Sequence, residues 1–119
     1  MAEMTIQPTI QGGVPLVALT GELDAYHAPR LKTELENQLG GSPGALVISL
    51  KRVSYVDSTG LGVLVAVRKQ AEPAGVSLHL VMSPESAVRR TFTITGLLPV
   101  FSIFDDEAAA LEAAAFKEG

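Results

Sequence analysis

No stretch constrains the fold of this chain more than residues 53–69, VSYVDSTGLGVLVAVRK. It follows an apolar run at residues 45–50 and passes through small polar residues and two glycines into a second apolar run. This order predicts a strand, a loop and a helix, with residues 57–60 at the corner between loop and helix. Asp and Ser are preferred helix N-caps, and the positive end of the helix dipole points at Ser58. We therefore expect the fold to tolerate a phosphate on the Ser58 hydroxyl.

Propensity alone leaves a second possibility for the apolar half of this stretch. Val63, Val65 and Val67 are β-branched and alternate with Leu64 and Ala66, which also suits a strand. Periodicity does not separate a buried strand from a buried helix in a short apolar run. We favour a helix, because residues 60–72 are long for a strand, begin with capping residues and end in cationic ones.

The composition limits the classes of function open to the chain. Its 119 residues suffice for one domain, which we expect to span residues 1–119 with its core at about residues 5–115. The net charge of −4 and the lack of a run of Lys and Arg argue against nucleic-acid binding. There is no cysteine, which excludes disulfides, thiolate metal sites and a cysteine nucleophile. His27 and His79 are too isolated for a metal site, and we expect no cofactor.

Neither a secretory signal nor a membrane span is expected. The first eight residues have no basic flank and no apolar core. No apolar run approaches the length that crosses a bilayer. We therefore expect a cytoplasmic protein that does not bind membranes.

Turn and capping residues divide the rest of the chain. Pro8 confines the first strand to a sheet edge, and Gly12 with Gly13 predicts a hairpin to the second strand. Asp24 is the expected N-cap of the first helix, and Ser83 that of a short third helix. The last helix is rich in alanine. Its expected inward-facing residues are Ala108, Leu111 and Ala115.

Strands that alternate with helices predict an α/β domain with a mixed, mainly parallel sheet. We expect about five strands and four helices, with the N-terminal edge strand antiparallel to its neighbour. Right-handed crossovers place successive strands side by side, and binding sites in such sheets lie at the carboxyl ends of the strands. The loops at those ends are residues 21–24, 53–59 and 83–86. Asp24 and Ser58 are therefore expected on one rim of the sheet.

Three sequence motifs together indicate a family: GELD at 21–24 before the first helix, VSYVDSTGLGVL at 53–64, and TGL at 95–97 before the last strand. In this order they resemble the STAS-domain anti-sigma factor antagonists, the anti-anti-sigma proteins of bacterial partner-switching systems. The resemblance runs from Ile6 to Ala115, and DSTGLG is its most specific part.

The resemblance implies a regulatory binding protein without catalytic residues. In the family a conserved Ser, matched here by Ser58, is phosphorylated by an anti-sigma factor that is also a serine kinase of the histidine-kinase-like ATPase type. The unphosphorylated protein binds that anti-sigma factor and frees the sigma factor, and a metal-dependent serine phosphatase restores it. Asp24 matches an acidic position of the family that contacts the partner.

The predicted partner-binding surface combines Asp24 with the residues at the corner between loop and helix. It comprises Asp24, Asp57, Ser58, Thr59, Gly60, Leu61 and Gly62. From capping preferences alone a Ser in this place is more often a plain cap than a phosphorylation site, and the resemblance reverses that balance for Ser58. Asp24 can be an N-cap, a partner contact or both. Thr59 keeps the reading of a solvent-facing or capping hydroxyl, while Gly60 and Gly62 would let another molecule approach the backbone closely.

Three other functions remain as alternatives, two suggested by the residues and one by the family resemblance. A nucleotide loop at Gly60 and Gly62 lacks both the third glycine of a dinucleotide fingerprint and the lysine of a P-loop. A phospho-aspartate receiver at Asp57 needs a cluster of acids for Mg²⁺, and the first strand–helix junction offers only Glu22 and Asp24. A STAS domain can also serve as a scaffold of a stress-sensing complex or as a regulatory subunit of lipid-transport machinery.

Overall fold

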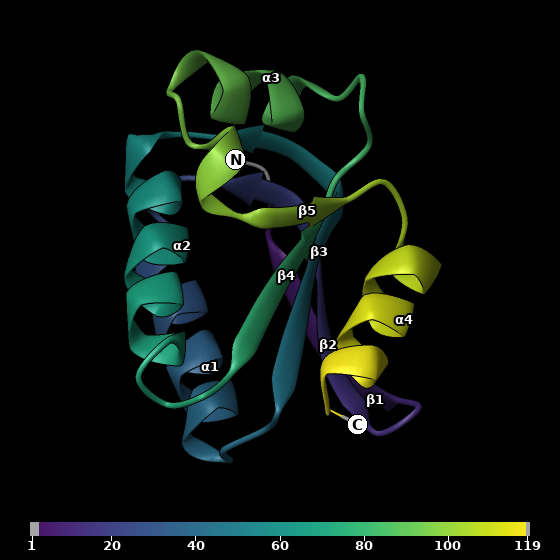
Figure 1. The fold of residues 1–119 in the computed structure, drawn as a ribbon. Coiled ribbons are helices and arrows are strands. Elements are labelled where there is room, and N and C mark those ends of the chain that lie inside the picture. The colour runs from purple at the N-terminus through teal and green to yellow at the C-terminus, as the bar shows by residue number, and fades with distance from the viewer. Residues whose placement is uncertain (1–2, 119) are drawn as a thin grey trace.

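A sheet of five strands in the order β1-β2-β3-β4-β5 forms the centre of the computed structural model, which describes residues 3–118 and the side chains up to residue 115 (Figure 1). β1 pairs antiparallel with β2, and the other three pairings are parallel. The strands are β1 (Thr5–Gln11), β2 (Val14–Leu23), β3 (Ala45–Val56), β4 (Ser77–Val81) and β5 (Ser102–Phe104). The predicted mixed α/β sheet with an antiparallel N-terminal edge strand is confirmed.

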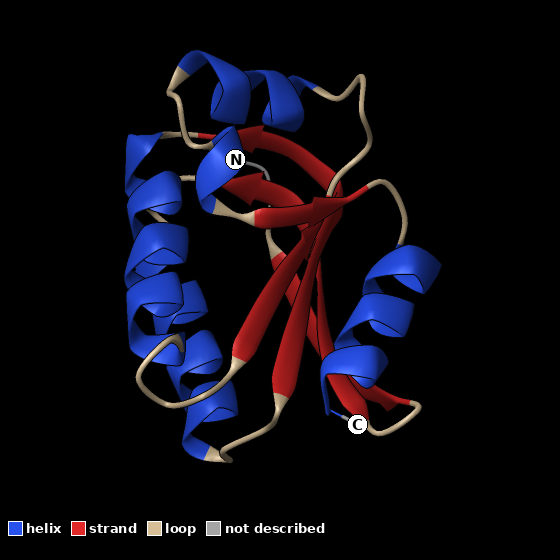
Figure 2. Cartoon of the chain, viewed as in Figure 1, coloured by secondary structure: helices blue, strands red, loops and turns tan. Residues whose placement is uncertain are grey.

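The helices cover both faces of the sheet, as Figure 2 shows. α1 (Ala28–Gly40) and α2 (Ser58–Ala71) lie together on one face, and α4 (Glu107–Glu118) lies on the other. The short α3 (Ala87–Ile94) sits at the end of the sheet, followed by a 3₁₀ turn at Leu98–Val100. Among the described residues no helix is both long and apolar enough to cross a membrane.

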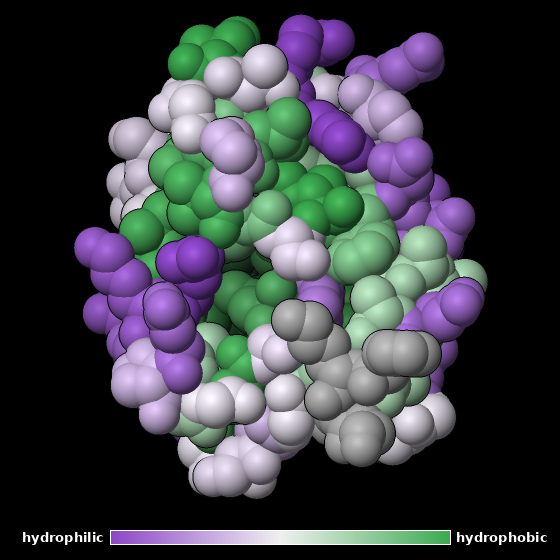
Figure 3. Space-filling model, viewed as in Figure 1, coloured by the Kyte–Doolittle hydropathy of each residue, from purple (hydrophilic) through white to green (hydrophobic). Residues whose placement is uncertain are grey.

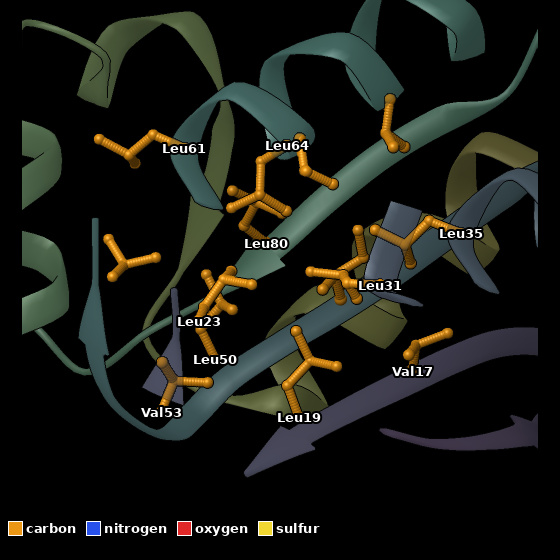
Figure 4. Close-up of a cluster of buried hydrophobic side chains, with 14 of the residues drawn as sticks. Val17, Leu19, Leu23, Leu31, Leu35, Leu50, Val53, Leu61, Leu64 and Leu80 are labelled. Carbon is orange, nitrogen blue, oxygen red and sulfur yellow. The ribbon is translucent and has the colours of Figure 1, made fainter. Parts of the chain in front are cut away.

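The larger core lies between the sheet and the pair α1–α2 (Figure 4). Leu31 and Leu35 of α1, Leu64 of α2 and Leu80 of β4 belong to this core, and all four are fully buried. Burying one such leucine contributes roughly 1.5–3 kcal/mol. The buried residues of α2 recur at helical spacing, so the strand alternative for residues 63–67 is excluded. They are Gly60, Leu61, Val63, Leu64, Val67 and Ala71.

The smaller core lies under α4, where Ala110 and Ala114 pack on the opposite face of the sheet. Our prediction of the inward side of this helix was wrong for Ala108 and Ala115, which are exposed, whereas Leu111 is partly buried and packs against this core. Half of the residues of this helix are alanine, so its faces differ little in hydrophobicity and its sequence does not specify which face turns inward.

Two segments predicted as loops belong to strands. Thr20–Leu23 of β2 pairs with residues 52–56 of β3, in a register with two irregularities. This part of β3 has exposed Arg52, Ser54 and Tyr55, with only Val53 and Val56 buried. The sequence did not predict a strand here because the apolar alternation is short and lies among polar residues. An extension of only two paired strands buries few side chains, so its pattern is weak.

Two predicted N-caps lie three residues before the actual N-cap positions. α3 is capped by Ser86, whose Oγ accepts from the Arg89 N–H at 3.1 Å and donates to the Ser83 carbonyl at 2.9 Å. α1 starts after His27, which forms no side-chain cap. Asp24 therefore closes a turn ahead of α1 and does not cap the helix.

Candidate functional site

The corner between β3 and α2 presents the Ser58 hydroxyl to solvent. Asp57 is the N-cap of α2, because its Oδ1 accepts from the Gly60 N–H at 2.9 Å. Ser58 is the first residue of the helix and is exposed. Its hydroxyl forms no hydrogen bond with another residue in the described part of the chain. The hydroxyl is thus accessible, and it faces the positive end of the helix dipole.

Asp57 also connects this corner to the segment between β2 and α1. Its Oδ2 accepts from the Ala25 N–H at 3.1 Å, and its own N–H donates to the Leu23 carbonyl at 3.2 Å. Asp24 lies between these two partners in the chain. The expectation that Asp24 and Ser58 occupy one rim of the sheet is confirmed.

The Asp24 carboxylate is held from the side of α1. Its Oδ1 accepts from the His27 N–H at 3.1 Å and lies 2.8 Å from His27 Nδ1, so the Nδ1–H tautomer donates to it. Desolvation raises the pKa of Asp24, but the hydrogen bonds and charge of His27 outweigh it and hold the pKa below its usual value. Asp24 is therefore anionic at neutral pH, and its side chain remains 23% exposed.

The two glycines of the corner differ in their surroundings. Gly60 is buried, and a Cβ there would lie 2.5 Å from the Leu23 carbonyl oxygen and 2.7 Å from Leu23 Cγ. The close approach at Gly60 is thus made by the chain's own β2, which corrects the idea that it leaves space for another molecule. Gly62 is exposed with no atom within 4 Å of such a Cβ, so the helix backbone there is open to a partner.

The remaining predicted contact residues divide by exposure. Thr59 is exposed beside Ser58, whereas Leu61 is only 6% exposed and belongs mainly to the core. Sequence reasoning missed two aromatic residues beside the site: Tyr26, in the turn before α1, is 72% exposed, and Tyr55, near the end of β3, is 50% exposed. Each stands two positions from an aspartate of the site in a chain with few aromatics, a signal that was available.

An apolar surface lies next to the corner. Figure 3 shows hydrophobic side chains gathered on the viewed face between α2 and the 3₁₀ turn. Val65 and Leu98 are only partly buried there, and Val100 is exposed. The expectation that α2 leaves some apolar surface uncovered is confirmed.

The polar surface around the Asp24 segment suits neither a metal nor a polyphosphate. Within residues 3–118 no group of three His, Asp or Glu side chains could hold a metal ion. An open hollow of about 820 Å³ lies beside Tyr26 and His27, but Glu3 and Glu34 line it together with Arg30. Two carboxylates would repel a polyphosphate in this hollow, which the alternative nucleotide loop at Gly60 and Gly62 does not line.

Comparison with known proteins decides the family. The STAS domain family matches residues 5–110. The chain is 44% identical over 87 residues to the anti-sigma-B factor antagonist of Bacillus subtilis, covering 73% of this chain and 78% of that protein. It is 39% identical to the protein of the same name from Listeria monocytogenes, covering 73% and 75%. The chain belongs to the STAS-domain anti-sigma factor antagonist family.

A solved structure extends the similarity to nearly the whole STAS domain. An anti-sigma factor antagonist from Mycobacterium paratuberculosis superposes with a TM-score of 0.86 at 29% identity, covering 95% of each chain. Members of this bacterial family are regulatory binding proteins and not enzymes. The site is therefore a candidate docking surface for a partner protein.

Proposed function

We propose that this STAS domain is an antagonist that binds an anti-sigma factor with serine kinase activity and so frees a sigma factor. Phosphorylation of Ser58 by that kinase ends the binding, and a serine phosphatase restores it. The supporting observation is the exposed Ser58 hydroxyl at the first position of α2, on the same rim as Asp24. Under this proposal the STAS domain and its partners act in the cytoplasm, where sigma factors bind RNA polymerase.

The kinase has to supply the chemistry of the transfer. Ser58 Oγ attacks the γ-phosphorus of ATP, the bond to the ADP oxygen breaks, and the hydroxyl proton must pass to a base. Since the Ser58 hydroxyl bonds to no other described residue of this chain, that base belongs to the kinase. The role of the STAS domain is to present the nucleophile on a rigid helix end.

The phosphate would change the surface without unfolding it. It adds a charge of about −1.5 to −2 at pH 7. The dipole of α2 offsets part of that charge, so the helix tolerates it. The phosphate stands near the carboxylates of Asp57 and Asp24, and a partner that fits the bare hydroxyl would have to bury these like charges together. Binding is lost through repulsion and desolvation at the interface.

The test uses the purified STAS domain and the purified anti-sigma factors with kinase-type ATPase domains encoded by the same genome. We expect the wild-type STAS domain to bind one of them. After Mg²⁺–ATP is added, that kinase should transfer one phosphate to Ser58, and the phosphorylated STAS domain should dissociate from it. Ser58→Ala should keep binding in the presence of ATP, and Ser58→Glu should weaken it by about 100-fold or more. Calorimetry gives the affinities and mass spectrometry the phosphorylated residue.

Thr59→Ala is the matched control, since Thr59 is the adjacent exposed hydroxyl. It should bind and be phosphorylated like wild type. Equal affinities of Ser58→Ala and Ser58→Glu, or a phosphate found on Thr59, would contradict the proposal. Absence of any kinase-type partner would favour the scaffold or lipid-transport role instead.

A further inference from the structure

Both carboxylate oxygens of Asp57 are engaged within the chain. Oδ1 accepts from Gly60 in the first turn of α2, and Oδ2 accepts from Ala25, which lies 32 positions earlier. The side chain is half-buried. A partner that used these oxygens as its main contact would compete with two backbone N–H groups, each of which would lose its acceptor.

The bond to Ala25 is the tether between the corner and the Asp24 segment. Leu23 is fixed at the end of β2 by packing against Gly60 and by the bond from the Asp57 N–H. His27, the residue before α1, holds Asp24 from the other side. Between these two anchors, the Ala25 N–H bonds to Asp57 and to no other described residue.

We propose that Asp57 is a positioning residue, which holds the Asp24 segment against the first turn of α2 so that the kinase meets Asp24 and Ser58 as one rigid epitope. This inference rests on the proposed function. It reassigns Asp57 and Gly60 from the predicted contact surface to its support. Direct contact is left to the exposed members of the site: Asp24, Ser58, Thr59 and Gly62.

The first arm of the test measures the tether without any partner. In Asp57→Ala the Ala25 N–H loses its acceptor, so we expect its hydrogen exchange, followed by NMR, to accelerate by about tenfold or more. Asp106→Ala is the matched control, because Asp106 Oδ1 accepts from the Ala109 N–H at 2.8 Å at the start of α4. It removes a similar capping bond on the other face of the sheet and should leave Ala25 exchange unchanged.

The second arm measures docking by a double-mutant cycle. We expect Asp57→Ala to raise KM for Ser58 phosphorylation by about tenfold with kcat within about twofold, and to have almost no further effect in an Asp24→Ala background. Because Asp57→Ala also removes the cap of α2, Asp57→Asn is measured beside it. Its single acceptor oxygen can serve the cap or the tether but not both, so it should recover only part of the loss.

The outcomes separate this inference from the proposed function. Unchanged Ala25 exchange in Asp57→Ala, or an effect of Asp57 that stays the same when Asp24 is absent, overturns the positioning role. If wild type binds no kinase-type anti-sigma factor, the proposed function fails, and Ala25 exchange alone then decides whether Asp57 holds the segment.

Discussion

Gly60 lies where the first turn of α2 meets the end of β2, and the absence of a side chain there permits the contact with Leu23. Alanine would raise helix propensity by about 1 kcal/mol. Its Cβ would nevertheless meet a backbone carbonyl oxygen that cannot rotate away, at 2.5 Å. Steric fit therefore outweighs propensity at this position.

The pair Gly60→Ala and Gly62→Ala tests this conclusion. We expect Gly60→Ala to lower the free energy of unfolding by about 1–3 kcal/mol. Gly62→Ala, in open space one half-turn on, should raise it by about 0.5–1 kcal/mol. Urea denaturation measures both. Similar effects of the two substitutions would mean that the contact with Leu23 does not constrain the corner.

Asp24 makes the stability depend on pH in a defined direction. Its pKa is lowered in the folded state by His27 against the opposing effect of desolvation. The stabilisation is therefore complete above the usual pKa of an aspartate, about 3.9, and is lost as the pH falls through the lower folded value.

We expect the difference in unfolding free energy between wild type and Asp24→Asn to be constant above about pH 5 and to shrink below about pH 4. NMR titration of the Asp24 carboxyl carbon gives the pKa directly. A pKa at or above that of an unfolded peptide would mean that the bonds from His27 do not outweigh desolvation, and the predicted pH dependence would be wrong.

At the scale of the elements, the sequence predicts type better than boundary. The helix at residues 58–71 follows from its length and its caps despite three valines. The start of α3 does not, because Ser83 and Ser86 are both good caps, and only the structure shows that Ser86 receives the Arg89 N–H. Asp24 closes a turn that precedes α1. A local sequence pattern does not distinguish an aspartate that closes such a turn from one that caps the helix.

The register of α4 leads to a prediction of its own. Ala110 is fully buried against the face of the sheet formed by Val14, Leu16, Ala45, Val47 and Val81. Ala110→Leu should lower the free energy of unfolding by about 1–3 kcal/mol through overpacking. Ala108→Leu, on the exposed side, should change it by less than about 0.5 kcal/mol. A larger loss for Ala108→Leu in thermal unfolding would place the helix in the register that its sequence suggested.

At the scale of the whole molecule, the rim was predictable and its tether was not. Alternating strands and helices with right-handed crossovers place the ends of β2 and β3 side by side, which brings Asp24 near Ser58. In the sequence Asp57 is only a helix cap. Its bond to Ala25 joins residues 32 positions apart, beyond the end of a strand pair whose register has two irregularities, so no local pattern specifies it.

This arrangement predicts that phosphorylation acts on the surface and leaves the fold intact. Ser58 stands at the end of α2, outside both cores. Ser58→Glu should therefore change the free energy of unfolding by no more than about 1 kcal/mol, in the stabilising direction, because the new charge lies at the positive end of the helix dipole. Its NMR shift changes should stay within the rim segments, residues 23–27 and 56–62. Ser54→Glu, on exposed β3 without a helix end, is the control and should show no stabilisation. Shift changes that reach α4 or β1 would mean that the switch works by rearranging the sheet, and the electrostatic account of lost binding would then be wrong.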